Sequence, residues 1–398
     1  MRLERPSREI AGAGGSASFD VEALRAREFP WTQTGQTIFL NAASTGPLPR
    51  RTVETAEAWA ALRAEPHRLG DSTLFATLSK SRELIAKLIG ARTSEIALAV
   101  NTSYGMNVAA FALPLVPGDV IVTPDAEFPA NVYPWAAAAR ARGLEYRRIP
   151  LKDGVLDEDA LHRALEDRAV KCVSVSWVGF ANGYRVDLAR LGRACRQHGA
   201  YFVVDAIQGL GPCTIDVSKL EIDVLACGAQ KWLLSPWGAG FVYVRQELAR
   251  TLDPPMVSWM AARGTDDFAR LTQYDFEWRD DARRYEFVTL PFQDFAGLNS
   301  SLELFMEVGP SRIADHITRL ADEIVSWSRE TGVPLVTPAD RSRRAGIVCV
   351  RPRDATAVSA RLKEQGVVHS YREGAIRLAP HIYNTSHEIR RALEIIAS

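Results

Sequence analysis

Six short apolar runs, separated by stretches with the periodicity of helices, constrain the fold of this 398-residue chain more than any other feature. Each run is continuously apolar, whereas a strand with one solvated face alternates apolar and polar residues. Continuous apolar runs are typical of strands that are buried on both faces. We therefore predict an α/β fold with a mostly parallel central sheet and helices on both faces. The predicted strands are Ile96–Val100, Asp119–Thr123, Cys172–Trp177, Tyr201–Val204, Val224–Cys227 and Gly240–Val244.

The segment between two of these runs illustrates the expected helices. Leu188, Leu191 and Cys195 share one face of a helix over residues 187–198. Asp187 can cap the start of this helix, and Gly199 follows its end.

The pattern of the chain changes near Gly297, which indicates a second, smaller unit. Helical stretches continue to about Glu330 and are followed by two short strands, Gly346–Val350 and Ala375–Ala379, each with a helix after it. We predict three parts: a flexible N-terminal arm at residues 1–18, a large α/β domain at 19–298 and a small C-terminal α+β domain at 299–398.

Charge and composition argue against several function classes. Lys and Arg total 48, as do Asp and Glu, so the chain has no net charge and we expect no nucleic-acid partner. No apolar run approaches the roughly 20 residues that cross a bilayer, and no secretory signal begins the chain, so we expect a cytoplasmic protein without membrane contact. The five cysteines include no close pair, and the sequence predicts no metal site. The motifs of metallohydrolases, serine hydrolases, dinucleotide-binding enzymes and P-loop enzymes do not occur.

A lysine and an aspartate each follow a predicted buried strand. The chain has only seven lysines, and Lys231 alone follows such a strand, next to Trp232. Apolar surroundings lower the pKa of a lysine and suit an amine that forms an imine. Asp205 ends the run that begins at Tyr201. Taken alone, Lys231 could instead extend its amine into solvent along an apolar surface, and Asp205 could cap a helix or pair with a cation.

Two further segments follow predicted strands. Thr102 and Ser103 precede a helical run, where hydroxyls and free N–H groups can bind an anion or can simply cap the helix. Phe128 follows the run Asp119–Thr123 and can stack on a planar ring or pack in the core.

The carboxyl ends of parallel strands meet at one edge of a sheet, and ligands bind outside this edge. An anion site, an aromatic face, a carboxylate and an amine in apolar surroundings would therefore lie together. Pyridoxal phosphate requires this combination, because its phosphate needs donors, its pyridine nitrogen needs an acid and its aldehyde needs an amine. The joint occurrence of these residues predicts a pyridoxal phosphate site.

On these residues, the sequence resembles the class V aminotransferases, a family of fold-type I pyridoxal phosphate enzymes that includes cysteine desulfurases, selenocysteine lyases, isopenicillin N epimerases and kynureninases. The resemblance runs from Phe39-Leu-Asn-Ala-Ala-Ser44 to Tyr383-Asn-Thr. It implies that Lys231 forms the Schiff base and that Asp205 partners the pyridine nitrogen. The other cofactor-binding residues that it implies are Gln208 at the ring hydroxyl, Phe128 on the ring face, Thr102 and Ser103 at the phosphate, and Gln230 in the place of a frequent histidine.

The resemblance also implies a homodimer with shared active sites. The segment Arg284-Tyr-Glu-Phe-Val-Thr289 is similar to the family's Arg-Phe-Glu-x-Gly-Thr, and Thr289 would reach the phosphate in the neighbouring subunit. Arg377 matches the arginine that binds the substrate carboxylate, a task for which the paired donors of a guanidinium are suited. The resemblance further assigns Asn131, Ser44 and His67 to the substrate side.

Two departures from the family bear on the reaction. Cysteine desulfurases carry a catalytic cysteine in a loop before that arginine, whereas residues 368–375 contain none and Cys349 lies on a predicted strand as a core residue. Trp177 replaces a family asparagine, which is closer to the isopenicillin N epimerase-like branch. We expect Arg185 to be structural, tied to Asp187 or to a helix end.

These residues predict an enzyme that acts at Cα of an amino acid through a Lys231 aldimine, with Lys231 as the general base. Transamination or epimerisation ranks first, and β-elimination such as C–S cleavage ranks second. A non-catalytic binding protein with the same fold is another alternative. So is a sugar aminotransferase, which would not need Arg377 to bind a carboxylate.

Overall fold

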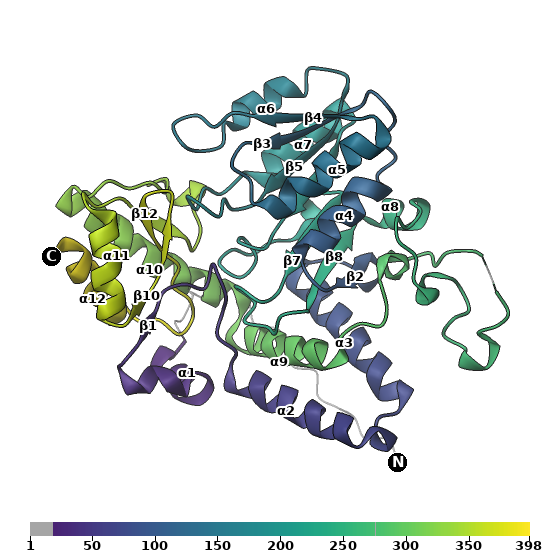
Figure 1. Cartoon of the computed structure of the whole chain (residues 1–398), viewed down its shortest axis with the longest axis horizontal. Helices are drawn as coiled ribbons and strands as arrows, with labels where there is room; N and C mark the ends of the chain where they lie inside the picture. Colours follow the sequence, from purple (N-terminus) through teal and green to yellow (C-terminus); the bar gives the residue numbers. More distant parts are fainter. Residues whose placement is uncertain (1–18, 275) are drawn as a thin grey trace, which may run out of the picture.

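A computed structural model describes residues 19–274 and 276–398, so the arm predicted at residues 1–18 lies outside the described residues. Its large sheet has seven strands in the order β2-β8-β7-β6-β5-β3-β4 (Figure 1). All strands run parallel except β8, which is antiparallel to both of its neighbours. The strands are β2 (Ile96–Ala99), β3 (Val120–Pro124), β4 (Glu145–Ile149), β5 (Val170–Ser176), β6 (Tyr201–Asp205), β7 (Val224–Gly228) and β8 (Gly240–Val244).

The predicted mostly parallel sheet is confirmed, and the six predicted strands occur within one or two residues of their expected bounds. The sequence does not predict β4, whose residues Glu-Tyr-Arg-Arg-Ile are half-buried or exposed. This strand lies at the edge of the sheet, where it lacks the continuous apolar pattern of the central strands.

Helices cover both faces of this sheet, as predicted. Consecutive strand residues point to opposite faces, so Leu98 and Val204 belong to one core while Ala97 and Val203 belong to another. The helices on the first face are α3 (Asp71–Ile89), α6 (Glu158–Ala164), α7 (Leu188–His198) and α9 (Phe292–Val308), and those on the second are α4 (Thr102–Ala112), α5 (Tyr133–Arg142) and α8 (Gln246–Thr251). Helix α2 (Arg50–Ala64) packs against α9 (Figure 1).

Helix α7 has the predicted ends and the predicted buried face. Its N-cap is Asp187, whose side chain accepts a hydrogen bond from the backbone N–H of Arg190. Gly199 ends the helix with a φ of 66°, and Leu188, Leu191 and Cys195 are buried.

The C-terminal residues form a smaller unit with its own core, at the left of Figure 1. Its antiparallel sheet has the order β11-β12-β9, and a separate parallel pair joins β1 to β10. The predicted strands correspond to β9 and β12, and each is followed by a helix, whereas the sequence does not predict the very short β10 and β11. The elements are β9 (Val348–Val350), β10 (Val367–Val368), β11 (Ser370–Arg372), β12 (Ala375–Leu378), α10 (Pro310–Thr331), α11 (Ala355–Glu364) and α12 (Ser386–Ala397).

Residues near the start of the described chain pack on this C-terminal unit. Strand β1 (Ile38–Phe39) pairs with β10, and Arg25 in α1 (Val21–Glu28) donates to Tyr383 O and to Glu388 Oε1. The boundary predicted at residue 298 falls inside α9. The division into domains by residue range stays a prediction.

Within residues 19–274 and 276–398, the structure contains no helix with the length and apolar character needed to span a membrane. The same residues include no cluster of three or more His, Cys, Asp or Glu side chains that could hold a metal ion.

Gly105 allows α4 to pack directly on the sheet. A Cβ atom at this position would lie 2.6 Å from Ala226 Cβ in β7 and 2.8 Å from Val242 Cγ2 in β8. These distances are shorter than van der Waals contact, so a larger residue forces the helix and the strands apart. The start of α4 is thereby held beside the end of β7.

Gly105→Val should destabilise the folded protein, because the added side chain pushes α4 away from β7 and β8. We expect the free energy of unfolding to fall by about 1–3 kcal/mol, as measured by thermal or chemical denaturation. Asn107→Ala, on the half-buried side of the same helix, should change it by less than about 0.5 kcal/mol. Equal stability of Gly105→Val and the wild type would contradict this close packing.

Candidate active site

Four of the predicted site residues stand at the carboxyl ends of parallel strands. Thr102 follows β2, Phe128 follows β3, Asp205 ends β6 and Lys231 follows β7. Because these strands run in one direction within one sheet, the four residues lie along the same edge. Contacts between them, described next, bring them together.

Lys231 is half-buried and faces Phe128. Its Nζ lies 5.3 Å from the centroid of the Phe128 ring and makes no hydrogen bond or ion pair with the described residues. Burial lowers the pKa of Lys231 to about 8, an effect that the carboxylate of Asp205 opposes and the guanidinium of Arg377 strengthens. An amine with this pKa is partly neutral near pH 7, which favours a reactive amine over a solvated surface lysine.

Asp205 is buried, and one of its two carboxylate oxygens has no hydrogen-bond partner among the described residues. Its side chain is 1% exposed, and Oδ1 accepts a hydrogen bond from the backbone N–H of Ile207 at 3.0 Å. Oδ2 has no partner among the described residues. Burial raises the pKa of Asp205 to about 6, although the Ile207 hydrogen bond and the charge of Lys231 act in the opposite direction. A buried oxygen without a partner is unfavourable, so a ligand with an N–H donor would stabilise it.

The start of α4 provides donors beside these groups. Asn101 is the N-cap, because its Oδ1 accepts a hydrogen bond from the backbone N–H of Tyr104 at 2.9 Å. Thr102 Oγ1 accepts from the backbone N–H of Gly228 at 2.9 Å, which joins the helix start to β7. Ser103 is exposed in the first turn. Since Asn101 caps the helix, the hydroxyl groups of Thr102 and Ser103 can donate to an anion.

Phe128 stands at the edge of the sheet and not in the core. Its side chain is 41% exposed, and its ring meets the ring of Phe180 edge to face, with 5.3 Å between the centroids. The alternative of a core phenylalanine is therefore wrong. One face of the Phe128 ring remains directed toward Lys231 and can stack on a planar group.

Gln230 belongs to the turn at residues 230–233 that carries Lys231, here called the lysine turn, and Gln208 contacts this turn through Trp232. Gln208 is buried, donates from Nε2 to Ala43 O at 3.0 Å and accepts from Trp232 Nε1 at 2.7 Å. One N–H of Gln208 is left for the predicted contact with a ring hydroxyl. Gln230 is half-buried, and its backbone oxygen accepts from Gly46 N at 2.9 Å.

Arg377, on β12 of the C-terminal unit, brings a buried cation to the site. Nη1 donates to Phe180 O at 2.8 Å, while Nη2 donates to Ser44 Oγ at 2.8 Å and to Ser370 Oγ at 3.2 Å. Nε has no partner, and no described carboxylate forms an ion pair with this guanidinium, which is 2% exposed. Burial lowers the pKa of Arg377 to about 10. The predicted substrate residues Arg377 and Ser44 are thus in direct contact.

The other predicted residues make no described contact with Lys231. Asn131 is fully buried, and its Oδ1 accepts from Trp135 Nε1 at 3.0 Å and from Ser174 Oγ at 2.6 Å, so the protein already uses this oxygen. His67 and Thr289 are exposed, and no described contact joins either of them to Lys231. Thr289 lines a cavity of about 490 Å³ together with Pro66 and Leu69, which lie close to His67 in the sequence. No residue of the lysine turn lines this cavity.

Glu127 is a half-buried acid at this edge to which the sequence assigns no role. Oε1 accepts from the backbone N–H of Ser176 at 2.7 Å, and Oε2 accepts from Ser176 Oγ. The pKa of Glu127 is raised to about 7, mainly by burial and to a smaller extent by the charge of Asp205. Its position, after an apolar strand and before Phe128, is the signal that could have identified it.

The departures from the family pattern have structural explanations. Trp177 is buried and packs so closely on Gly209 that a Cβ there would lie 2.3 Å from its ring. Cys349 is fully buried on β9, which confirms the core interpretation. Arg185 donates to Ser342 O at 2.8 Å, in the short helix η9 (Arg341–Arg343), which agrees with the expected helix end and not with Asp187.

The residues present fit pyridoxal phosphate. The unpartnered Oδ2 of Asp205 can accept a hydrogen bond from a protonated ring nitrogen, and the neutral amine of Lys231 can react with an aldehyde. Phe128 offers a ring face, and the start of α4 offers donors to a phosphate. Each of these groups can therefore contact a ligand without breaking a described contact within the protein.

Proteins similar to this chain carry the names of several related enzymes. Residues 38–391 match the family model described as Aminotransferase class-V. The uncharacterized aminotransferase YcbU of Bacillus subtilis is 32% identical over 318 residues, which cover 80% of this chain and 82% of that protein. Isopenicillin N epimerase of Amycolatopsis lactamdurans is 28% identical, over 90% of this chain and 94% of its own length. A probable cysteine desulfurase of Pyrococcus abyssi is also 28% identical, over 93% and 95% of the two chains.

Solved structures share the fold. The cysteine desulfurase of Thermococcus onnurineus NA1 matches with a TM-score of 0.79 and 25% identity, covering 94% of this chain and 96% of that chain. A mutant of C-DES, with glycine covalently linked to its pyridoxal phosphate cofactor, matches with a TM-score of 0.84 and 22% identity, covering 94% and 99%. The predicted fold class is therefore confirmed.

The charges around Lys231 predict opposite pKa shifts in two variants. Asp205→Asn removes a carboxylate that raises the pKa of Lys231, so this pKa should fall below about 8. Arg377→Gln removes a cation that lowers it, so the pKa should rise. Both shifts can be measured in the cofactor-free protein from the rate at which an amine-reactive reagent modifies Lys231, followed against pH by peptide mass spectrometry.

Asp216→Asn is the control for these variants, because Asp216 pairs with Lys219 at the surface. It should leave the pH profile of Lys231 modification unchanged. Shifts of the same sign in Asp205→Asn and Arg377→Gln would contradict the described electrostatics.

Proposed function

This chain belongs to the class V aminotransferase family of pyridoxal phosphate-dependent enzymes, and on that premise we propose that it acts at Cα of an amino acid, with Lys231 as the reacting amine and general base. Transamination or epimerisation is the reaction that we favour. One observation carries the proposal: the pKa of Lys231 responds both to the carboxylate of Asp205, whose Oδ2 has no partner, and to the buried guanidinium of Arg377.

Residues at the carboxyl edge of the sheet would hold the cofactor. Asp205 would accept a hydrogen bond from the ring nitrogen, Phe128 would cover one ring face, and the start of α4 at Thr102 and Ser103 would bind the phosphate. The bound cofactor supplies a protonated ring that delocalises the electron pair left at Cα. The open Oδ2 of Asp205 supports this role, since an ionised carboxylate that faces the ring nitrogen would keep it protonated.

Arg377 would bind the substrate carboxylate. Its described partners, Phe180 O, Ser44 Oγ and Ser370 Oγ, are neutral oxygens that leave the positive charge unbalanced. A carboxylate would neutralise this buried charge through paired, charge-assisted hydrogen bonds. Binding there would also fix the orientation of the substrate relative to Lys231.

Lys231 would move the proton at Cα. Its lowered pKa supplies neutral Nζ near pH 7, and neutral Nζ can accept this proton as a general base. Delivery of a proton to the opposite face of Cα, by a second acid or by water, would invert the configuration and complete an epimerisation. In a transamination the amino group would instead pass to the cofactor, and water would release the carbon skeleton as a keto acid. The names of YcbU and of isopenicillin N epimerase support these two outcomes.

A β-eliminating C–S lyase is the second candidate, because relatives of this chain are named cysteine desulfurases. A desulfurase that forms a persulfide needs a reactive thiolate near the substrate. All five cysteines are buried, and burial raises the pKa of each of them, to about 12 for Cys349. These thiols are poor nucleophiles, so a lyase reaction here would have to proceed without a cysteine.

We also propose that two copies of the chain share their active sites. Residues 256–287 carry a group of exposed apolar side chains: Met256, Val257, Trp259, Phe268, Leu271, Tyr274, Phe276 and Phe287. Exposed apolar patches of this kind are typical of protein interfaces. Thr289 follows this segment and makes no described contact with Lys231, as expected of a residue that serves a neighbouring copy.

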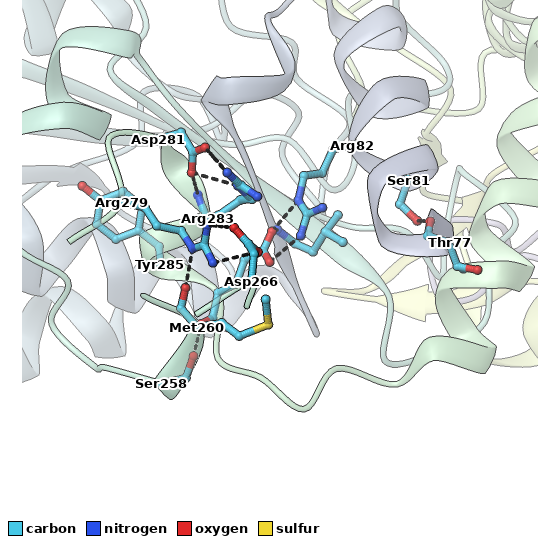
Figure 2. Close-up of polar contacts among 12 residues, drawn as sticks. Thr77, Ser81, Arg82, Ser258, Met260, Asp266, Arg279, Asp281, Arg283 and Tyr285 are labelled. Carbon is cyan, nitrogen blue, oxygen red and sulfur yellow. Dashed lines mark hydrogen bonds and ion pairs between the residues drawn. The ribbon is translucent and has the colours of Figure 1, made fainter. Parts of the chain in front are cut away.

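One ion-pair cluster braces this segment internally, and another joins it to the rest of the chain (Figure 2). Arg279 pairs with Asp266 and donates to Met260 O, and Arg82 on α3 forms two hydrogen bonds with Glu286. Glu286 also accepts from the backbone N–H of Leu98 in β2 at 3.0 Å. The anchored segment holds its exposed apolar side chains in place, where a second copy could cover them.

Incubation of the purified protein with pyridoxal phosphate and single amino acids should reveal the reaction. We expect a keto acid or a loss of chirality, without sulfide, from at least one amino acid, and covalent fixation of the cofactor to the Lys231 peptide by borohydride. Lys231→Ala should abolish both, since no other described amine occupies this position. Lys87→Ala, at an exposed helix position, should behave as the wild type.

The alternatives give other results in the same assays. Sulfide together with ammonia and a keto acid would favour β-elimination, and cofactor binding without turnover of any amino acid would favour a binding protein. Full activity of Arg377→Ala would favour a substrate without a carboxylate, such as a sugar. A cofactor adduct that borohydride still fixes in Lys231→Ala would contradict the assignment of Lys231.

The proposed dimer predicts a particle of twice the chain mass of 43.9 kDa in light scattering. Trp259→Glu combined with Phe287→Glu should yield a monomer, because two charges would be buried unpaired in the interface. The monomer should also bind pyridoxal phosphate more weakly, since Thr289 of the second copy is lost. Val116→Glu, at an apolar residue that is exposed outside this segment, should remain dimeric. A monomeric wild-type protein with full cofactor affinity would contradict shared sites.

A further inference from the structure

His381, in the C-terminal unit, contacts the backbone of the turn that carries Lys231. Its Nε2 lies 2.9 Å from Trp232 O. Its Nδ1 accepts a hydrogen bond from the backbone N–H of Ile382 at 2.7 Å. Because Nδ1 is an acceptor, the proton of the neutral ring is on Nε2, which therefore donates to the Trp232 carbonyl. The tautomer of His381 is thus fixed by its own backbone, and its donor is directed at the lysine turn.

Two aromatic rings hold His381 in this orientation. The imidazole stacks on Trp232, with 5.5 Å between centroids and 27° between planes, and on Tyr383, with 5.7 Å and 6°. The side chain is fully buried, and burial lowers its pKa to about 3. His381 therefore stays neutral and keeps one donor and one acceptor at physiological pH.

The other two carbonyls of the turn also have partners, one from a distant segment and one from the residue that follows the turn. Gln230 O accepts from the backbone N–H of Gly46 at 2.9 Å, and Lys231 O accepts from the backbone N–H of Leu234 at 3.2 Å. A Cβ on Gly46 would lie 2.2 Å from Lys231 O, so the N-terminal segment presses directly on this turn. His381 supplies the third support, for Trp232 O, from the opposite end of the sequence.

His381 is also connected to the residue that binds the carboxylate in the proposed function. Arg377 lies on β12, four residues before His381, and the intervening Ala379 donates from its backbone N–H to Leu40 O at 2.8 Å. A short, buried stretch of backbone therefore carries both the guanidinium and the support of the lysine turn. The spacing between Lys231 and Arg377 depends on this stretch.

We propose that His381 is a positioning residue, which holds Lys231 at its place relative to Arg377 through the hydrogen bond to Trp232 O and the ring stack. The inference rests on the proposed function of Lys231 and extends it to a residue that touches neither cofactor nor substrate. Loss of this hydrogen bond leaves a buried carbonyl without a partner and lets the turn move toward solvent. Lys231 would then lose the burial that lowers its pKa.

Two amide variants separate the two nitrogen atoms of His381. The amide of His381→Asn can replace Nδ1 but is too short to reach Trp232 O, whereas the amide nitrogen of His381→Gln can replace Nε2. We expect His381→Asn to raise the pKa of Lys231 and His381→Gln to leave it close to the wild-type value. A rise of one unit lowers the neutral fraction of the amine near pH 7 about tenfold. The modification rate of Lys231 in the cofactor-free protein should fall accordingly.

His316→Asn is the matched control. His316 is also buried in the C-terminal unit, but its Nε2 contacts Asn384 O instead of the lysine turn. Its substitution should lower the melting temperature without changing the modification of Lys231. A change of less than about twofold in His381→Asn, or equal changes in His381→Asn and His381→Gln, would overturn the proposal.

The same variants distinguish this inference from the function on which it rests. If the wild-type protein binds pyridoxal phosphate and borohydride fixes it on Lys231, the proposed function holds. The pH dependence of the cofactor absorbance should then shift in His381→Asn and be restored in His381→Gln. Failure of the wild type to bind the cofactor would count against the proposed function, while the modification rates of Lys231 would still decide the role of His381.

Discussion

The site depends on one electrostatic constraint: an amine, a carboxylate and a guanidinium are close together in a poorly solvated place. Buried charges are unfavourable unless a counter-charge or hydrogen bond compensates them. Asp205 and Arg377 act in opposite directions on Lys231, and their own pKa values move toward the neutral forms. Neither of the two has all its polar atoms satisfied by the protein. The unsatisfied polar atoms of Asp205 and Arg377 suit a protonated ring nitrogen and a carboxylate, which the proposed cofactor and substrate would supply.

The fold meets this constraint by assembling the site from separate units. The parallel sheet brings Asp205 and Lys231 to one edge, because strands that run in the same direction end together. A different, antiparallel sheet brings Arg377. The segment with Ser44 and Gly46 lies between them and contacts both sides. The carboxylate and the guanidinium thus belong to different sheets, and their spacing is a property of the packing between the units.

Local sequence predicts most of the sheet and its polar edge, since continuous apolar runs and the residues after them are visible in short windows. The polar edge strand β4 lacks this signal. The role of His381 rests on a contact across 149 residues, which no short pattern encodes. The resemblance to a family supplies Arg377, and the structure places it beside Ser44. Thr289 and His67 make no described contact with Lys231 within one chain, and in the proposed dimer Thr289 would serve the neighbouring copy.

The contacts that support the lysine turn also determine when this turn can become fully supported during synthesis of the chain. Gly46 is synthesised early and His381 late, yet both hold the three residues around Lys231. The strands of the large sheet can pair while the ribosome is still translating the C-terminal unit, whereas contacts with a large sequence separation form late. A nascent chain that ends before residue 381 therefore has its sheet but lacks a rigid lysine turn. In the proposed function, a cofactor would then meet the complete support of Lys231 only after residue 381 has been synthesised.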